Sequence, residues 1–196
     1  MNSENTLLMK DSSGNPAPLG LIAFGMTTVL LNIANSGIYE LNSMILAMGI
    51  FYGGLAQIFA GLMEWKKNNT FGLTAFVSYG LFWLSLVALI VMPKLGWINE
   101  TSAAGFVYYF ILWGIFTFLM YIGTLRISKA LQVVFGTLTI LFILLAVADA
   151  TGSAGIRIIA GIEGIVCGAS AIYAGIAQVL NETYGKIVLP LGLVKK

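Results

Sequence analysis

Six long apolar stretches, separated by short polar segments, make up most of the chain. Each is long enough for a helix, at about 1.5 Å per residue, to cross a hydrocarbon core of roughly 30 Å. None alternates between apolar and polar residues with the period of two that a transmembrane β-strand shows. The pattern therefore predicts an all-α bundle of six transmembrane helices at residues 16–36, 42–63, 70–92, 103–125, 130–148 and 153–180.

The connections between these stretches are short, so neighbouring helices are expected to run antiparallel within one bundle. We expect an N-terminal tail at 1–14, a transmembrane domain at 15–181 and a C-terminal tail at 182–196. The N-terminal tail carries Glu4, Lys10 and Asp11 and has no apolar centre, so it does not resemble a cleavable signal.

Composition agrees with a membrane protein and excludes several other classes. Hydrophobic residues form 59% of the chain and charged residues only 9%, which is too few for an ordinary soluble surface. The formal net charge of +2 comes without a basic patch, so no nucleic acid is expected as a partner. With one cysteine, no histidine and no paired carboxylates in the spans, we expect no metal site, no cofactor and no enzymatic activity.

Lysines and arginines gather on one side of the predicted bundle. Eight lie in the tails or in the loops after the second and fourth helices, and two lie on the opposite side. The eight are Lys10, Lys66, Lys67, Arg126, Lys129, Lys186, Lys195 and Lys196, and the two are Lys94 and Arg157. This bias predicts a plasma-membrane protein with both termini in the cytoplasm.

Polar side chains recur at helical spacing on the predicted spans. The first helix places Phe24, Thr28, Asn32 and Asn35 on one face. Small and hydroxyl residues of this kind are ordinary contacts between membrane helices. The amides of Asn32, Asn35 and Gln57 are more costly to bury in hydrocarbon, so as a set they favour a hydrated pore.

Glu163 is the clear ionisable residue within the predicted spans. An acidic group at this depth is unfavourable, so it either takes part in proton movement or is a protonated or hydrogen-bonded packing residue. No lysine or arginine lies mid-span. A carboxylate would therefore cross by using amides, hydroxyls and the positive end of the first helix, or it would cross as the neutral acid.

The first helix opens with the run NPAPLGL at 15–21, where Asn15 suits a helix N-cap and both prolines fall in the first turn. This run resembles the signature of the acetate uptake transporter family. Further runs follow in the order found in that family, and the resemblance covers nearly all of residues 15–192. They are FYGGLAQIFAG at 51–61, SYGLFW at 78–83, WGIFT at 113–117, CGASAIY at 167–173 and LPLG at 189–192.

The resemblance implies a pore in each protomer, assembled as a homohexamer, for acetate and related short carboxylates, with succinate as a further candidate. Transport would occur as an anion channel or as a proton-coupled symporter. The family's aromatic and aliphatic constriction falls on Phe24, Tyr79 and Leu138.

The resemblance also implies roles for other positions along the path. Polar lining positions of the family fall on Asn15, Thr27 and Gln57, and a position associated with substrate size falls on Ala171. Glu163 departs from the family pattern, because the bacterial permease has an apolar residue there. No role carries over to it.

Two rival readings remain open from the residues alone. The same bundle could conduct small neutral solutes, in which case flux would ignore pH and would not be competed by acetate. It could also be a structural or signalling assembly, because the small residues Ala160, Gly164 and Gly168 would serve a helix interface equally well.

Overall fold

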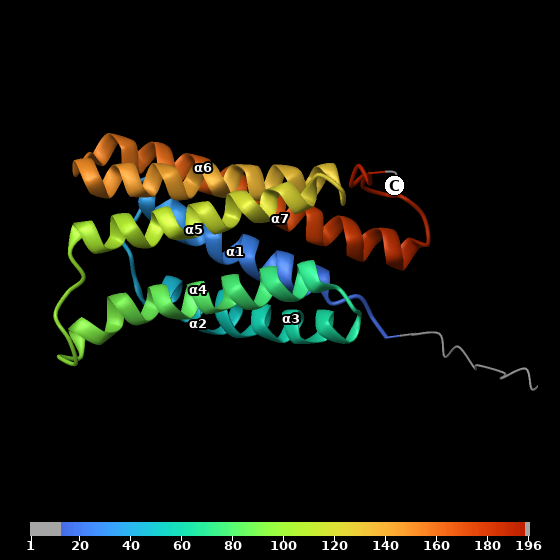
Figure 1. The fold of residues 1–196 in the computed structure, drawn as a ribbon, viewed down its shortest axis with the longest axis horizontal. Coiled ribbons are helices and arrows are strands. Elements are labelled where there is room, and N and C mark those ends of the chain that lie inside the picture. Colours follow the sequence, from blue (N-terminus) through green and yellow to red (C-terminus); the bar gives the residue numbers. More distant parts are fainter. Residues whose placement is uncertain (1–12, 195–196) are drawn as a thin grey trace, which may run out of the picture.

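Six helical spans run along one axis and alternate in direction (Figure 1). The computed structural model describes residues 13–194, so most of the predicted 1–14 tail and the charged residues Glu4, Lys10, Asp11, Lys195 and Lys196 lie outside the described residues. The helices are α1 (Ala17–Asn35), α2 (Ser43–Ile50), η1 (Phe51–Ala56), α3 (Gln57–Lys66), α4 (Thr70–Lys94), α5 (Ala103–Thr124), α6 (Lys129–Thr151) and α7 (Ala154–Tyr184). The expected all-α class with six spans is confirmed.

Side-chain caps define where most spans begin. A polar side chain before each of α2, α4, α5, α6 and α7 accepts a backbone N–H from the first helical turn, which satisfies a donor that the helix cannot pair. These caps are Asn42, Asn69, Ser102, Ser128 and Ser153. Helix α1 begins one residue later than expected, with Pro16 rather than Asn15 at the N-cap and no side-chain bond from the cap residue. Asn15 Oδ1, one position earlier, still accepts from the N–H of Ala17 at 3.1 Å.

The second span is not one continuous α-helix. Residues Phe51–Ala56 form a π-helical turn between α2 and α3, so the expectation of an uninterrupted helix over 42–63 is wrong there. Helix α4 comes very close at this turn, since a Cβ on Gly80 would lie 2.8 Å from the carbonyl oxygen of Gly54. π-Helical turns are rare and occur often at functional sites.

Helices α1 and α7 pack more extensively on each other than any other pair. A Cβ on Gly25 would lie 2.6 Å from the carbonyl oxygen of Gly168, and a Cβ on Gly168 would lie equally close to the carbonyl oxygen of Gly25. The two backbones therefore touch directly, which small residues allow in membrane helices. One turn further along, the Asn32 side chain occupies the space beside Gly164. The stripe of Ala160, Gly164 and Gly168 therefore serves a contact inside the protomer.

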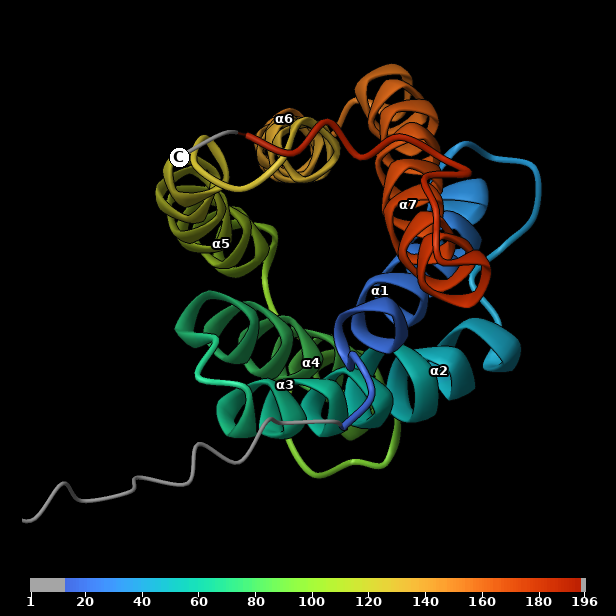
Figure 2. The ribbon, with the colours of Figure 1, turned by 90° about the vertical axis from the view of Figure 1, so that its right-hand side faces the viewer.

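The end-on view shows α1, α4, α5, α6 and α7 arranged around the middle of the bundle, with the second span outside α1 and α4 (Figure 2). Helix α5 packs mainly on α6, and its backbone comes close to that of α4 at only a few positions. Aromatic rings fill the space between α4 and α5 instead. Phe82 of α4 stacks on Tyr109 of α5, and Tyr79 of α4 contacts Trp113 and Phe116 of α5.

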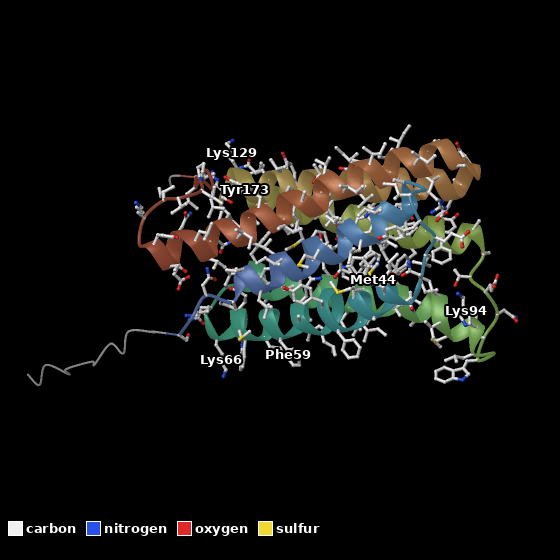
Figure 3. The ribbon with its side chains drawn as sticks, turned by 180° about the vertical axis from the view of Figure 1, so that it is seen from behind. Met44, Phe59, Lys66, Lys94, Lys129 and Tyr173 are labelled. Carbon is white, nitrogen blue, oxygen red and sulfur yellow. The ribbon has the colours of Figure 1, made fainter. Side chains whose placement is uncertain are left out.

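After α7 the chain folds back across the end of the bundle (Figure 2). Backbone hydrogen bonds join it to the start of α6, from Lys129 N–H to the Gly192 carbonyl at 2.8 Å and from Ala130 N–H to the Leu191 carbonyl at 3.0 Å. The Tyr173 hydroxyl, labelled in Figure 3, donates to the Pro190 carbonyl at 2.8 Å. Residues up to Leu193 therefore cover part of the end where both described chain ends lie.

The charged and apolar side chains on the outer surface are distributed as in a membrane protein. Lys66 and Lys129 lie at one end of the bundle and Lys94 at the other, while Phe59 projects outward from the first turn of α3 (Figure 3). The Phe59 side chain is 58% exposed, which suits contact with lipid tails. The chain is a multi-pass membrane protein.

The close contact of α1 and α7 predicts a sharp difference between two glycines of α7. We expect Gly164→Ala to lower the free energy of unfolding by about 1–3 kcal/mol, because the new Cβ would lie 2.2 Å from Cγ of Asn32. Gly155→Ala is the matched control, since the nearest atom there is 3.8 Å away. Thermal unfolding of the two purified variants in detergent would test this, and equal stability would contradict the proposed packing.

Candidate functional site

Three cavities lie in series along the middle of the bundle. The cavity on the side of the chain ends, which we call the terminal cavity, has a volume of about 510 Å³. The cavity on the other side, the distal cavity, has a volume of about 300 Å³. Between them is a central cavity of about 20 Å³, enough for roughly one water molecule.

Shared lining residues establish the order of these cavities. Phe24 and Leu138 border both the distal and the central cavity. Leu21 and Phe135 border both the central and the terminal cavity. The path from one side of the bundle to the other is therefore constricted where these apolar side chains meet.

The structure brings together the three residues to which the resemblance assigned a constriction. Phe24, Tyr79 and Leu138 all border the central cavity, and each is at most 5% exposed. The ring centroids of Phe24 and Tyr79 lie 5.8 Å apart. Bulky apolar side chains around so small a space form a dry barrier to ions and polar solutes. We call these three residues the gate.

Tyr79 is held in place from behind. Its hydroxyl donates to Thr117 Oγ1 of α5 at 2.9 Å, and the Thr117 hydroxyl donates in turn to the Trp113 carbonyl at 2.7 Å. The ring of Tyr79 also contacts Phe116 and Phe135. The Tyr79 hydroxyl is therefore bonded to α5, and it is the ring of Tyr79 that faces the central cavity.

Gln57 is the polar side chain that borders the central cavity. It is fully buried, and its Nε2 donates to the Gly53 carbonyl in the π-helical turn at 2.6 Å. Its Oε1 is buried without a hydrogen-bond partner among the described residues. A buried acceptor without a partner is unfavourable, so Gln57 is suited to accept a hydrogen bond from a molecule that passes the gate.

The distal cavity has a polar rim with a paired charge. Arg157 of α7 forms an ion pair with Asp149 of α6, and both border the cavity. The Asn32 amide donates to the Thr28 carbonyl at 2.9 Å and accepts from Asn35 Nδ2 at 3.0 Å. The four residues predicted to share one face of the first helix, Phe24, Thr28, Asn32 and Asn35, all line this cavity.

The terminal cavity carries both amides and carboxylates. Asn15 Nδ2 donates to Gln178 Oε1 at 3.0 Å, which links the start of α1 to the end of α7. Glu64, only 3% exposed, accepts from Asn69 Nδ2 at 2.7 Å. Lys67 donates to the Ser13 carbonyl at 2.5 Å. The first polar position implied by the resemblance, Asn15, therefore lies on the cavity wall.

Three of the expected site residues border none of these three cavities: Thr27, Ala171 and Glu163. Thr27 lies against Gly53, where a Cβ would approach it to 2.8 Å, so it packs behind the turn that holds Gln57. Ala171 is fully buried in the core. Both carboxylate oxygens of Glu163 are buried without a hydrogen-bond partner in the described part of the chain.

Sequence reasoning missed two parts of the site. Thr117 holds Tyr79 from another helix, and no local pattern predicts which hydroxyl meets which phenol. Leu191 and Leu193 border the terminal cavity because the segment after α7 folds back over it. The run LPLG at 189–192 signals the family resemblance, but nothing in it predicts a place on the cavity wall. Within residues 13–194 no cluster of histidine, cysteine and acidic side chains has the makeup of a metal site.

Six spans that enclose two cavities on either side of a narrow gate are the architecture of a membrane transport protein. The chain belongs to the GPR1/FUN34/yaaH family, which it matches over residues 1–194. The resemblance inferred from the motifs is therefore confirmed.

Individual relatives agree with this membership. The chain is 58% identical over 178 residues to the succinate-acetate/proton symporter SatP of Escherichia coli K12, covering 91% of this chain and 95% of that protein. It is 35% identical over 181 residues to ammonia transport outward protein 2 of Saccharomyces cerevisiae, covering 86% of this chain and 63% of that protein. The solved structure of the bacterial acetate channel SatP matches with a TM-score of 0.91 and 57% identity, over 92% of this chain and 100% of that one.

The link between Tyr79 and Thr117 predicts a coupled effect on stability. Thr117→Val should lower the free energy of unfolding by about 1–3 kcal/mol, because it leaves the buried Tyr79 hydroxyl without an acceptor. In a Tyr79→Phe background the same substitution should have a clearly smaller effect. Thr139→Val is the control, since the Thr139 hydroxyl donates only to the Phe135 carbonyl of its own helix. Additive effects in unfolding measurements would show that the two residues are not linked.

Proposed function

We propose that this protein conducts acetate and related short carboxylates across the plasma membrane through a pore within each protomer. The observation that carries the proposal is the gate of Phe24, Tyr79 and Leu138, which leaves about 20 Å³ between two much larger cavities. A solute must displace these side chains to pass, which favours small substrates over bulky ones. The names of the bacterial relatives, a succinate-acetate/proton symporter and an acetate channel, support the same substrate class.

The charges along the path suit a monocarboxylate that crosses either as an anion held by neutral donors or as the neutral acid. Among the described residues that border the central cavity, none carries a lysine, arginine, aspartate or glutamate side chain. The fixed charges lie at the two ends, where Glu64 and Lys67 border the terminal cavity and Arg157 pairs with Asp149 at the distal one. A multiply charged anion would lose its hydration at the gate without a counter-charge, so acetate is favoured over succinate.

Orientation and assembly complete the proposal. Lys66, Lys67, Arg126, Lys129 and Lys186 lie on the side of the chain ends, so the positive-inside rule supports a cytoplasmic position for both termini. The distal cavity then opens to the outside. The outer faces of the helices are apolar and suit contact with lipid or with neighbouring copies in a homohexamer. Native mass spectrometry of the detergent-solubilised protein would report the number of copies.

Purified protein in liposomes tests the function when pH and voltage are set independently. We expect saturable uptake of labelled acetate, above that of protein-free liposomes, which other short carboxylates compete. Uptake driven by voltage alone would indicate an anion channel. Uptake driven by a proton gradient at zero voltage would indicate symport. Acetate uptake no faster than in protein-free liposomes, or flux of neutral solutes that ignores pH and acetate, would contradict the proposal.

Glu163 is the proposed proton-linked residue if transport proves to be symport. Its buried carboxylate has no hydrogen-bond partner in the described residues, which suits a group that changes protonation. Glu163→Gln should then abolish accumulation driven by the proton gradient while exchange of acetate at equal pH persists. Glu100→Gln, in an exposed loop, is the matched control. Unchanged coupling in Glu163→Gln would assign this residue to packing.

The gate predicts a change in size selection. Phe24→Ala should join the central and distal cavities and raise the ratio of lactate flux to acetate flux by about tenfold, because the additional carbon and hydroxyl of lactate no longer meet the ring. Tyr79→Ala should act in the same direction. Phe59→Ala removes an equal ring from the lipid-facing surface and should leave the ratio unchanged. A constant ratio in both gate variants would exclude these residues from the gate.

A further inference from the structure

The segment after α7 completes the first turn of α6. The first backbone N–H groups of a helix have no partner within it, and the Ser128 side chain serves one of them here. The N–H of Lys129 donates to the Gly192 carbonyl at 2.8 Å. The N–H of Ala130 donates to the Leu191 carbonyl at 3.0 Å. Two of the N–H groups that begin α6 are therefore satisfied by a segment that lies far later in the chain.

Side chains of α7 give this segment its shape. Asn181 Oδ1 accepts from the N–H groups of Val188 and Leu189 at 2.7 and 3.0 Å. Asn181 Nδ2 donates to the Leu189 carbonyl at 2.8 Å, and the Tyr173 hydroxyl donates to the Pro190 carbonyl at 2.8 Å. The segment is thus bonded to α7 on one side and to α6 on the other, and it ties the two helices together where it crosses the end of the bundle (Figure 2).

A glycine stands where the segment comes closest to α6. Gly192 has a φ of +63°, a left-handed conformation that side chains rarely adopt. A Cβ on Gly192 would lie 2.8 Å from Cβ of Lys129. The last residue of the run LPLG at 189–192 is therefore suited to this contact, which gives the run a structural reason beyond the family resemblance.

The segment is held mainly by hydrogen bonds. Leu191 packs on the apolar core, but Ile187 is 79% exposed and Leu193 is 74% exposed. Segments with few buried apolar contacts open locally at a low cost in free energy. Residues 186–194 can therefore leave α6 while the bundle stays folded.

The start of α6 and this segment together form one wall of the terminal cavity. Ser128 and Leu131 border the cavity from α6. Leu191 and Leu193 border it from the segment. The gate residue Leu138 follows Leu131 by seven positions, which is about two helical turns. The hydrogen bonds of the segment thus hold the end of α6 that leads directly to the gate.

We propose that residues 186–194 form a latch that holds the start of α6 against α7 and keeps the terminal cavity narrow. This structure is the latched state. Release of the latch removes part of the cavity wall and frees the first turn of α6, so the cavity widens and the gate becomes accessible from the side of the chain ends. The latch goes beyond the proposed function, because it controls access to the gate whichever solute crosses it.

The reactivity of a thiol at the inner end of the terminal cavity tests the latch. Ala75 borders both the terminal and the central cavity, so Ala75→Cys together with Cys167→Ala places one thiol beneath the latch. The detergent-solubilised protein is treated with a small charged thiol reagent, and mass spectrometry gives the rate of modification. Gly192→Ala brings a Cβ against Lys129, and Asn181→Ala removes the hydrogen bonds that shape the segment. Each should raise the rate by about tenfold.

Matched variants at the other end of the bundle exclude general effects of the substitutions. Gly96→Ala acts at a φ of +73° with no atom within 4 Å of the new Cβ, and Asn99→Ala lies in an exposed loop. Both should leave the rate unchanged. Equal rates with and without the latch substitutions, in variants with unchanged helical circular dichroism, would overturn the latch. If Gly192→Ala does not fold, Asn181→Ala decides alone. The assay involves no transport, so failure of the proposed function would show separately, as absence of acetate exchange in the wild type.

Discussion

Direct backbone contact between α1 and α7 is the constraint on which the pathway depends. Gly25 and Gly168 leave no space for a side chain, so the two helices form one rigid pair. Because this face of α1 is used for packing, its other face, with Phe24 and Thr28, borders the path. Asn32 belongs to both faces, since its side chain fills the space beside Gly164 while the residue also borders the distal cavity. The position of the gate thus follows from small residues that take no part in it.

The opposite wall is built on a different principle. Helices α4 and α5 are held apart by aromatic rings, and Tyr79 lies among the rings of Trp113, Phe116 and Phe135. Its hydroxyl is fixed by Thr117, so this side of the gate is both bulky and well ordered. Rings have few rotatable bonds, so they can form a tight barrier without a large loss of conformational entropy. We therefore expect Phe24 on α1 or Leu138 on α6, rather than Tyr79 on α4, to be the side chain that moves when the gate opens.

The large features of this protein could be predicted from its sequence because they follow from periodicity. The six apolar stretches of membrane-spanning length predicted the six spans. The polar face of the first helix predicted one wall of the path. The π-helical turn at 51–56 was not predictable, because its apolar sequence is equally compatible with an α-helix. The two conformations differ only in whether a backbone N–H bonds to the carbonyl four or five residues earlier. Contacts between distant residues, such as Tyr79 with Thr117, depend on the packed bundle. The role of Thr27 and Ala171 stays a prediction, since both lie behind the cavity walls.

The account depends on a substrate path that runs through the protomer past Phe24. Blocking that position chemically tests it most directly. The protein would carry Phe24→Cys together with Cys167→Ala, and a small thiol reagent would be added while acetate exchange is followed in proteoliposomes. Met26→Cys, on the exposed side of the same helix, is the control. The account predicts that modification at position 24 stops exchange, that excess acetate slows the modification, and that modification at position 26 has no effect. Full exchange after complete modification at position 24 would show that acetate takes another path.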